Sequence, residues 1–313
     1  MDPRSDLRER FTQIQAEASR RWEAFWNDPR PLITVGTATC GLAQGAREVV
    51  WALREASVEM GLDVQIREVG CIGHCYAEPL VTVKMPGMSP YLYARVNPTK
   101  AQLLLRYCVR DNDPFLDFVM GALEPDELMP PVWDLPRFHF EKRLILENCG
   151  LIDPEDIHQY LAKGGYAALV RCLSMEPGQI IEKVAAARLR GRGGAGFPTA
   201  LKWEACRNSP HGNPLVICNG DEGDPGAYMD RALLESNPHQ VLEGLAIAAV
   251  AVGASEGYLY VRAEYPLAIE RVRKALEDAR SLGLMGRDVL GSGRDLDLRL
   301  FQGSGAFVCG EET

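Results

Sequence analysis

A glycine-rich stretch between Arg190 and Lys202, R-G-R-G-G-A-G-F-P-T-A-L-K, constrains this chain more than any other segment. Glycine lacks a Cβ atom, so its backbone can approach a ligand closely and can adopt positive φ angles. Successive N–H groups in such a loop form a concave surface that binds anions, phosphates above all. Arg192 and Lys202 add positive charge, and Phe197 offers a flat face to a planar ring. We therefore predict that this loop binds a phosphorylated, planar cofactor.

The surroundings of the loop argue against a standard dinucleotide site. Gly191-x-Gly193-x-x-Gly196 matches the fingerprint G-x-G-x-x-G, but that fingerprint must follow a strand and open a helix. The segment before it, 182–189, has instead the pattern of a helix. We expect a different kind of phosphate-binding loop. A flexible linker is the alternative, and the basic flanks and Pro198 make it the weaker interpretation.

Composition narrows the class of protein. The chain has 313 residues, 46% hydrophobic and 25% charged, which suits a globular protein of two or three domains. Its net charge of −9 argues against a nucleic-acid partner, which needs a basic face. No segment resembles a signal peptide, and the longest apolar run, 245–254, is too short to insert into a membrane. We expect a cytoplasmic protein that reaches the cytoplasmic face of a membrane only through partners.

Four regions are predicted along the chain. Residues 1–30 form an amphipathic helix, for docking or for packing on its own domain, because Leu7, Phe11 and Ala18 share one stripe. Residues 31–110 read as β-α-β-β-β-α, an order that suits a thioredoxin-like layer. Frequent prolines predict a linker over 111–140, and 141–313 is a second α/β domain.

The second domain places polar residues at the end of an apolar strand. We expect a helix that Asp153 caps and Pro154 opens, and a long buried helix over 233–252. Between them, the strand 215–218 delivers N-G-D-E-G-D at its carboxyl end, the edge where α/β sheets bind ligands. Acids at that edge suit hydrogen bonds to ribityl or ribose hydroxyls, or to the N–H edge of a flavin ring, better than contact with a phosphate.

Cysteine usage points to metal or cluster ligation rather than disulfides, because a reducing cytoplasm disfavours disulfides. The chain has nine cysteines, of which Cys71 and Cys75 form a close-spaced C-x-x-x-C pair. Cys40 lies at another loop end of the same small domain. Most of the others are expected to be small buried hydrophobes: Cys108, Cys149, Cys172, Cys206 and Cys218.

The segments T-A-T-C-G-L-A-Q-G-A and V-G-C-I-G-H-C-Y-A-E-P-L-V resemble the thioredoxin-like [2Fe–2S] ferredoxin family. That family has one cysteine pair after its first strand and a later C-x-x-x-C. Cys71 and Cys75 match the later pair, Cys40 matches one member of the first pair, and Val35 stands at the other position. The resemblance implies that Cys40, Cys71 and Cys75 hold a [2Fe–2S] cluster, with His74 as a possible fourth ligand. The alternative is a docking module without a cluster.

Three motifs resemble the NADH-binding, FMN-carrying flavoprotein subunit of respiratory complex I: the glycine loop, C-N-G-D-E-G-D-P-G-A-Y-M-D-R and G-A-F-V-C-G-E-E-T. Diaphorase subunits of NAD-linked hydrogenases and formate dehydrogenases share this module. The resemblance covers about 140–313, and the ferredoxin-like domain ahead of it is similar to the hydrogenase and bifurcating-enzyme branch. The implied fold is a thioredoxin-like domain followed by a Rossmann-like, non-standard FMN- and NADH-binding α/β domain.

The resemblance also implies the cofactor-binding residues. The glycine loop and its flank hold FMN, with Phe197 stacked on the nicotinamide or adenine of NADH. Asp224 falls where the family commonly has a glutamate that meets the NADH ribose; an acid there repels a 2′-phosphate, so NAD is expected over NADP. Phe307 replaces a commoner tyrosine. The full set is Gly191, Arg192, Gly193, Gly194, Ala195, Gly196, Phe197, Lys202, Asn219, Asp221, Glu222, Asp224, Phe307, Gly310, Glu311 and Glu312.

The implied reaction is hydride transfer from NADH to flavin N5, followed by single-electron transfer to iron–sulfur centres. No side chain is expected to act as an acid or base, so no catalytic residue is predicted. Expected partners are iron–sulfur proteins and other subunits of a redox complex, quinone-linked or similar. Family members continue with a ubiquitin-like insert and a [4Fe–4S] domain, so the chain is expected to be truncated or a fragment. The alternatives are a hydrogenase or formate dehydrogenase diaphorase and a non-catalytic docking subunit.

Overall fold

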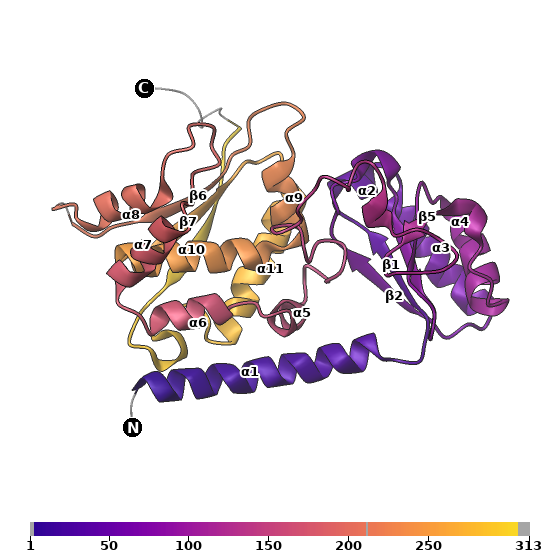
Figure 1. Cartoon of the computed structure of the whole chain (residues 1–313), viewed down its shortest axis with the longest axis horizontal. Coiled ribbons are helices and arrows are strands. Elements are labelled where there is room, and N and C mark those ends of the chain that lie inside the picture. The colour runs from indigo at the N-terminus through magenta and orange to yellow at the C-terminus, as the bar shows by residue number, and fades with distance from the viewer. Residues whose placement is uncertain (1–2, 211, 306–313) are drawn as a thin grey trace. The chain divides into compact units, whose positions relative to one another are not determined.

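The computed structural model describes residues 3–210 and 212–305 (Figure 1). The chain divides into two units, one made of Glu23–Pro154 and the other of Met1–Trp22 together with Glu155–Thr313. The boundary between them falls inside helix α1 (Pro3–Trp26). Four of the predicted cofactor-binding residues lie outside the described residues: Phe307, Gly310, Glu311 and Glu312.

The unit 23–154 contains a mixed sheet of order β2-β1-β3-β4-β5. Strand β1 runs parallel to β2 and antiparallel to β3, and β3 and β4 form an antiparallel hairpin. A parallel pair followed by an antiparallel hairpin is the thioredoxin-like layer predicted from the sequence, which is thereby confirmed. The strands are β1 (Leu32–Gly36), β2 (Gln65–Val69), β3 (Val81–Lys84), β4 (Tyr91–Tyr93) and β5 (Val119–Ala122).

Helices cover this sheet because their apolar residues recur at helical spacing. In α3, Val49, Leu53 and Ala56 lie on one face and are buried, together with Ile33 and Val35 of β1. The helical elements of the unit are α2 (Thr39–Ala43), α3 (Ala46–Glu59), α4 (Pro98–Leu104), a π-helical turn (Leu105–Arg110) and 3₁₀ turns at Cys75–Ala77, Leu116–Phe118 and Val132–Asp134.

The segment 111–140, for which the sequence predicts a linker, packs against the sheet instead. It contributes β5, which pairs with β4, and it buries Val132 and Phe138 beside Leu80 of the same unit. Its prolines are compatible with this pairing, because they flank an edge strand rather than interrupt a central one. The N–H of Ala122 donates to the carbonyl of Pro130 at 3.0 Å. A prediction based on proline content alone therefore takes this strand for part of a linker.

The second unit contains a parallel sheet of order β6-β7-β8 within its described residues. Its strands are β6 (Val216–Gly220), β7 (Glu256–Val261) and β8 (Asp297–Gln302). Its helices are α5 (Ile157–Ala162), α6 (Ala167–Leu173), α7 (Pro177–Ala186), α8 (Thr199–Arg207), α9 (Met229–Ser236), α10 (Pro238–Val252) and α11 (Pro266–Ser281), with a 3₁₀ turn at Val289–Gly291. The residues of α1 up to Trp22 group with this unit, and the apolar stripe predicted for α1 is buried at Leu7, Phe11 and Ala18.

Two helix predictions need correction. The helix expected to begin at Pro154, with Asp153 as its cap, begins at Ile157 instead. Asp156 is the residue that caps it, accepting a hydrogen bond from the His158 N–H at 2.9 Å. The single helix expected over 233–252 is divided into α9 and α10 at Pro238. Proline has no backbone N–H, so it cannot donate the hydrogen bond that a continuous helix needs at this position. The expected burial of α10 is confirmed.

None of the helices within residues 3–210 and 212–305 combines the length and the apolar character needed to cross a bilayer. This finding agrees with the short apolar runs of the sequence.

Candidate functional site

The glycine-rich stretch forms a closed lobe between α7 and α8. The N–H of Gly191 donates to the carbonyl of Phe197 at 2.9 Å, and the N–H of Thr199 donates to the carbonyl of Leu189 at 3.0 Å. These bonds tie the two ends of the loop together, so that residues 192–196 protrude between them. The helix before the loop confirms that the standard strand-first dinucleotide arrangement is absent at this position.

The backbone of the lobe is open to a ligand. Gly194 and Gly196 have φ angles of +106° and +61°, and a Cβ atom at either would meet nothing within 4 Å. Within the described part of the chain, the N–H groups of Gly193, Gly194 and Gly196 donate to no protein acceptor. Glycine is required at 194 and 196 by conformation rather than by crowding. Unsatisfied N–H groups on a protruding loop provide the chemistry of an anion-binding concavity.

The lobe leads directly into α8, whose N-terminus follows Pro198. The N-terminal end of a helix favours bound anions, because its first N–H groups lack helical partners. Lys202 lies exposed in the first turn of α8, Arg192 is exposed within the lobe, and the Phe197 ring is 51% exposed. The predicted positive charge and aromatic face are therefore accessible at this end of α8.

Glu222, predicted to face the cofactor, has its carboxylate directed to the start of α9. It accepts hydrogen bonds from the backbone N–H groups of Met229 at 2.6 Å, Asp230 at 3.2 Å and Arg231 at 3.3 Å, and from the Tyr265 hydroxyl at 3.1 Å. With 9% exposure and these donors around it, the side chain fixes the loop after β6. These contacts position the loop after β6, and the contact of Glu222 with the cofactor stays a prediction.

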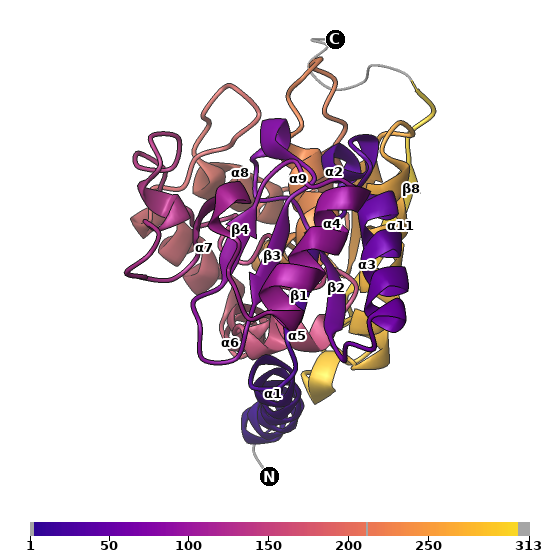
Figure 2. The same ribbon diagram turned by 90° about the vertical axis from the view of Figure 1, so that its right-hand side faces the viewer.

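The other predicted acids lie on the same loop. The side-chain oxygen of Asn219 accepts a hydrogen bond from the Asp221 N–H at 2.9 Å, which turns the chain sharply as it leaves β6. Asp221 is buried, whereas Asp224 is exposed. Burial, with the Glu222 charge as a further cause, raises the pKa of Asp230. Figures 1 and 2 show the glycine loop and this loop rising from the same end of the unit, where the strands have their carboxyl ends.

Arg262 is a residue of this edge that sequence reasoning missed. It follows β7, and its guanidinium donates to the backbone carbonyl of Glu222 and to the carboxylate of Glu264. It thereby links the loops after β6 and β7. The available signal was its position directly after a strand, at the edge where ligands bind.

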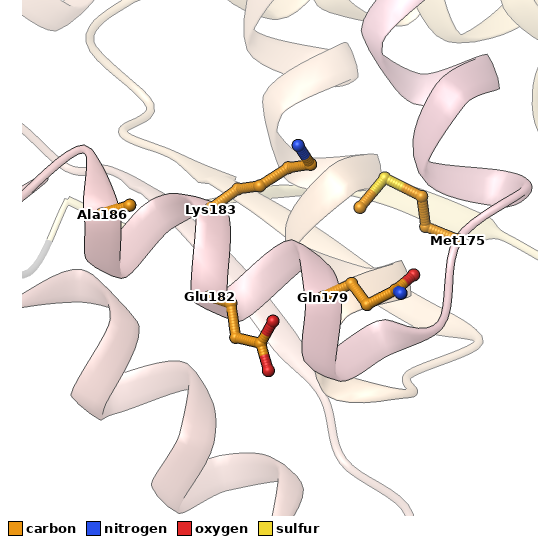
Figure 3. A pocket seen from close by; sticks show the side chains of 5 residues that line it. All are labelled: Met175, Gln179, Glu182, Lys183 and Ala186. Atoms are coloured by element: carbon orange, nitrogen blue, oxygen red, sulfur yellow. The ribbon is translucent and has the colours of Figure 1, made fainter.

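A hollow of about 480 Å³ lies elsewhere on this unit, along the exposed side of α7 (Figure 3). None of the predicted cofactor-binding residues lines it. The hollow is lined by Met175, Gln179, Glu182, Lys183 and Ala186. It therefore lends no support to the glycine-loop assignment.

The unit 23–154 brings the predicted metal-ligating cysteines together. Among the described residues, the sulfur atoms of Cys40, Cys71 and Cys75 lie within 4.8 Å of one another, and those of Cys71 and Cys75 are 3.7 Å apart. Cys40 lies in α2 after β1, while Cys71 and Cys75 follow β2. Hydrogen bonding to Cys40 and Cys75, together with burial, raises the pKa of the Cys71 thiol.

His74 does not join this group. Its Nε2 atom lies 2.7 Å from the Tyr76 hydroxyl, and its ring stacks on Phe138 with centroids 4.3 Å apart. The fully buried ring is held among aromatic side chains, and His74 lies outside the group that the three sulfur atoms form. Burial, followed by the charge of Arg137, lowers its pKa.

Glu78 lies next to the cysteines, and the sequence reasoning missed it. One carboxylate oxygen accepts a hydrogen bond from the Leu80 N–H at 2.7 Å, and the other lies 3.8 Å from the Cys40 sulfur. Burial raises the pKa of Glu78 to about 7. Several acidic groups converging in a buried place are difficult to ionise unless a cation is present. The donors therefore fit a metal centre. The available signal was an acid three residues after Cys75, beside an otherwise apolar strand.

Comparison with known proteins identifies the class of the second unit. Residues 184–313 match the family described as the Nuo51 FMN-binding domain. This match confirms the FMN-binding domain expected from the three motifs, and with it the resemblance to the complex I flavoprotein.

The chain is similar to parts of several known proteins. The chain is 52% identical over 171 residues to the "NADP-reducing hydrogenase subunit HndC" of Solidesulfovibrio fructosivorans, covering 55% of this chain and 35% of that protein. It is 44% identical over 181 residues to an NADH-quinone oxidoreductase subunit of Aquifex aeolicus, covering 57% of this chain and 42% of that protein. A crystal structure of an NAD⁺-reducing [NiFe]-hydrogenase is 24% identical with a TM-score of 0.44, covering 95% of this chain and 47% of that one. The matches thus span less than half the length of these relatives.

Proposed function

We propose that this chain is the NADH-oxidising subunit of a larger redox complex and that it binds FMN on the lobe 191–197. The observation that carries the proposal is the open glycine backbone at the N-terminus of α8, inside the stretch that matches the FMN-binding domain. FMN, when bound, supplies a ring that takes two electrons as hydride and passes them on singly. The side chains and backbone of this chain have to bind and orient the two ligands.

The backbone of the lobe and the charged residues beside it would hold the flavin and its phosphate. The N–H groups of Gly193, Gly194 and Gly196 would donate to anionic oxygens, and Arg192 and Lys202 would neutralise the phosphate charge. Phe197 presents a face for stacking. Glu222 and Arg262 hold the loop after β6, on which Asn219 and Asp221 would face the flavin. The remaining members of the proposed set are Gly191, Ala195, Asp224, Phe307, Gly310, Glu311 and Glu312.

We assign NADH rather than NADPH as the substrate on the basis of Asp224. This exposed acid on the loop after β6 would repel a 2′-phosphate by its negative charge. The relatives include a subunit named for NADP and one named for NADH, so family resemblance alone leaves the nucleotide open. Electron acceptors would be iron–sulfur subunits of the complex, which would also hold the chain at a membrane face where that complex is membrane-bound.

The test uses the whole purified chain. We expect a yellow protein with stoichiometric FMN, whose flavin absorbance is bleached by NADH under anaerobic conditions, and which reduces ferricyanide with NADH. A colourless protein that cannot be reconstituted with FMN would refute the flavin site. A flavin-loaded protein that NADH does not bleach would refute the NADH assignment.

A further inference from the structure

The unit 23–154 contains a metal-binding arrangement that goes beyond the cysteine ligands expected from the sequence. We propose that Glu78 is the fourth ligand of a metal centre that Cys40, Cys71 and Cys75 hold, so that three thiolates and one carboxylate bind the metal. This donor set suits iron in a [2Fe–2S] cluster or a single Zn²⁺ ion. The inference concerns only this unit and stands independently of the flavin site.

Two of the distances between the donors match those around a tetrahedral metal. With metal–sulfur bonds of about 2.3 Å, two ligand atoms on one tetrahedral metal lie roughly 3.5–3.8 Å apart. The Cys71 and Cys75 sulfurs are 3.7 Å apart, and a Glu78 oxygen is 3.8 Å from the Cys40 sulfur. Each pair therefore has the separation that shared coordination requires.

The carboxylate of Glu78 has no cationic partner among the described residues. It is 4% exposed, it accepts one hydrogen bond from the Leu80 N–H, and its other oxygen faces the Cys40 sulfur. A buried carboxylate is stable when a cation or several donors compensate it. A bound metal would supply that compensation, and it would also compensate the thiolates.

The carboxylate of Glu78 occupies space that is free because Gly36 and Gly41 have no side chains. A Cβ atom at Gly36 would lie 3.0 Å from a Glu78 oxygen, and one at Gly41 would lie 3.2 Å from it. A Cβ atom at Gly41 would also lie 2.2 Å from the Gly36 carbonyl oxygen. The backbone around the carboxylate is thus shaped to receive it between β1 and α2.

The other candidates for a fourth donor are unsuitable. Val35, at the position where the ferredoxin pattern has cysteine, is fully buried in the apolar core and offers no donor atom. His74 contacts Tyr76 through Nε2 and stacks on Phe138, and it lies outside the group that the three sulfur atoms form. Among these candidates in the described part of the chain, Glu78 is the one with an oxygen 3.8 Å from a cysteine sulfur, that of Cys40.

The first measurement is the metal content of the anaerobically purified chain. Iron with equimolar acid-labile sulfide identifies a cluster, and zinc without sulfide identifies a single ion; either result at one centre per chain supports the proposal. X-ray absorption at the edge of that metal is expected to show one oxygen neighbour in addition to sulfur. A chain that binds neither metal, even after reconstitution, would overturn the proposal, as would a first shell of sulfur alone.

Variants then test Glu78 itself. Glu78→Cys is expected to keep the metal, to lose the oxygen neighbour and, for a cluster, to shift the visible and EPR spectra. Glu78→Ala is expected to weaken metal binding by at least the roughly tenfold loss that follows removal of an outer-shell partner. Glu55→Gln, an exposed acid on α3, is the matched control and should change nothing. If circular dichroism shows folded Glu78→Ala and Glu78→Cys proteins with wild-type affinity and spectra, Glu78 is not a ligand.

Discussion

Replacement of Glu222 by alanine should destabilise the second unit through the loop after β6. The change removes the acceptor for the N–H groups of Met229, Asp230 and Arg231 and for the Tyr265 hydroxyl. Hydrogen bonds to a charged acceptor contribute about 1.5–3 kcal/mol each when buried, and a lost helix cap costs about 0.5–2 kcal/mol. The two longer bonds are weak, and water can reach the exposed start of α9, so the sum is limited.

We therefore expect Glu222→Ala to lower the free energy of unfolding by about 3 kcal/mol, a drop of roughly 6–12 °C in melting temperature for a unit of this size. Glu222→Gln keeps one acceptor oxygen and should lose about half as much. Differential scanning calorimetry on the whole chain measures both. Asp224→Asn, an exposed change on the same loop, is the control and should stay within about 0.5 kcal/mol of the wild type. A Glu222→Ala protein that melts with the control would refute the positioning role.

The remaining predictions concern the lobe, the nucleotide and the pH dependence. Gly194→Ala places a Cβ atom on a residue with φ +106° and should strain the lobe by about 1–3 kcal/mol, whereas Gly193→Ala, the control, adds a methyl group where φ is not positive. Gly194→Ala should therefore retain FMN more weakly than Gly193→Ala, and equal retention would contradict the prediction. Asp224→Asn should raise the ratio of kcat/KM for NADPH to kcat/KM for NADH about fivefold, because the repulsion between two exposed charges at contact is worth roughly 1 kcal/mol. An unchanged ratio would show that Asp224 does not contact the ribose. Burial lowers the pKa of His239 from 6.5 to about 3, so the unfolded chain binds a proton that the folded chain does not between these values. Stability should therefore be full above pH 6.5 and fall by about 1.36 kcal/mol per unit as the pH drops toward 3; His239→Gln should flatten this slope in urea denaturation, and an equally steep slope in the variant would show that other groups cause it.

The features that follow from local pattern were predictable from the sequence. The run 32–36 is rich in residues that favour strands, the segment after it has the apolar spacing of a helix, and the structure confirms both elements. The gathering of Cys40 with Cys71 and Cys75 was predictable too, because these cysteines lie at loop ends of one small domain. Glycine-rich composition likewise identified the lobe before its geometry was known.

The features that depend on distant contacts were not predictable in the same way. Glu222 looked like a ligand-facing acid, but the Tyr265 hydroxyl and the start of α9 engage its carboxylate. Glu78 was not singled out, because nothing near it in the sequence shows that Cys40 will be its neighbour. The strand 119–122 was hidden by prolines that an edge strand tolerates.

The tied ends of the glycine lobe limit the conformational entropy that cofactor binding has to remove. Because the hydrogen bonds from Gly191 to Phe197 and from Thr199 to Leu189 already fix both ends, only residues 192–196 remain to be ordered around a ligand. Ordering a free backbone costs roughly 1–2 kcal/mol per residue, so a longer untied loop would lose correspondingly more affinity. Ligand-dependent protection in hydrogen exchange should accordingly be concentrated in these residues, with the tied ends protected already in the free chain.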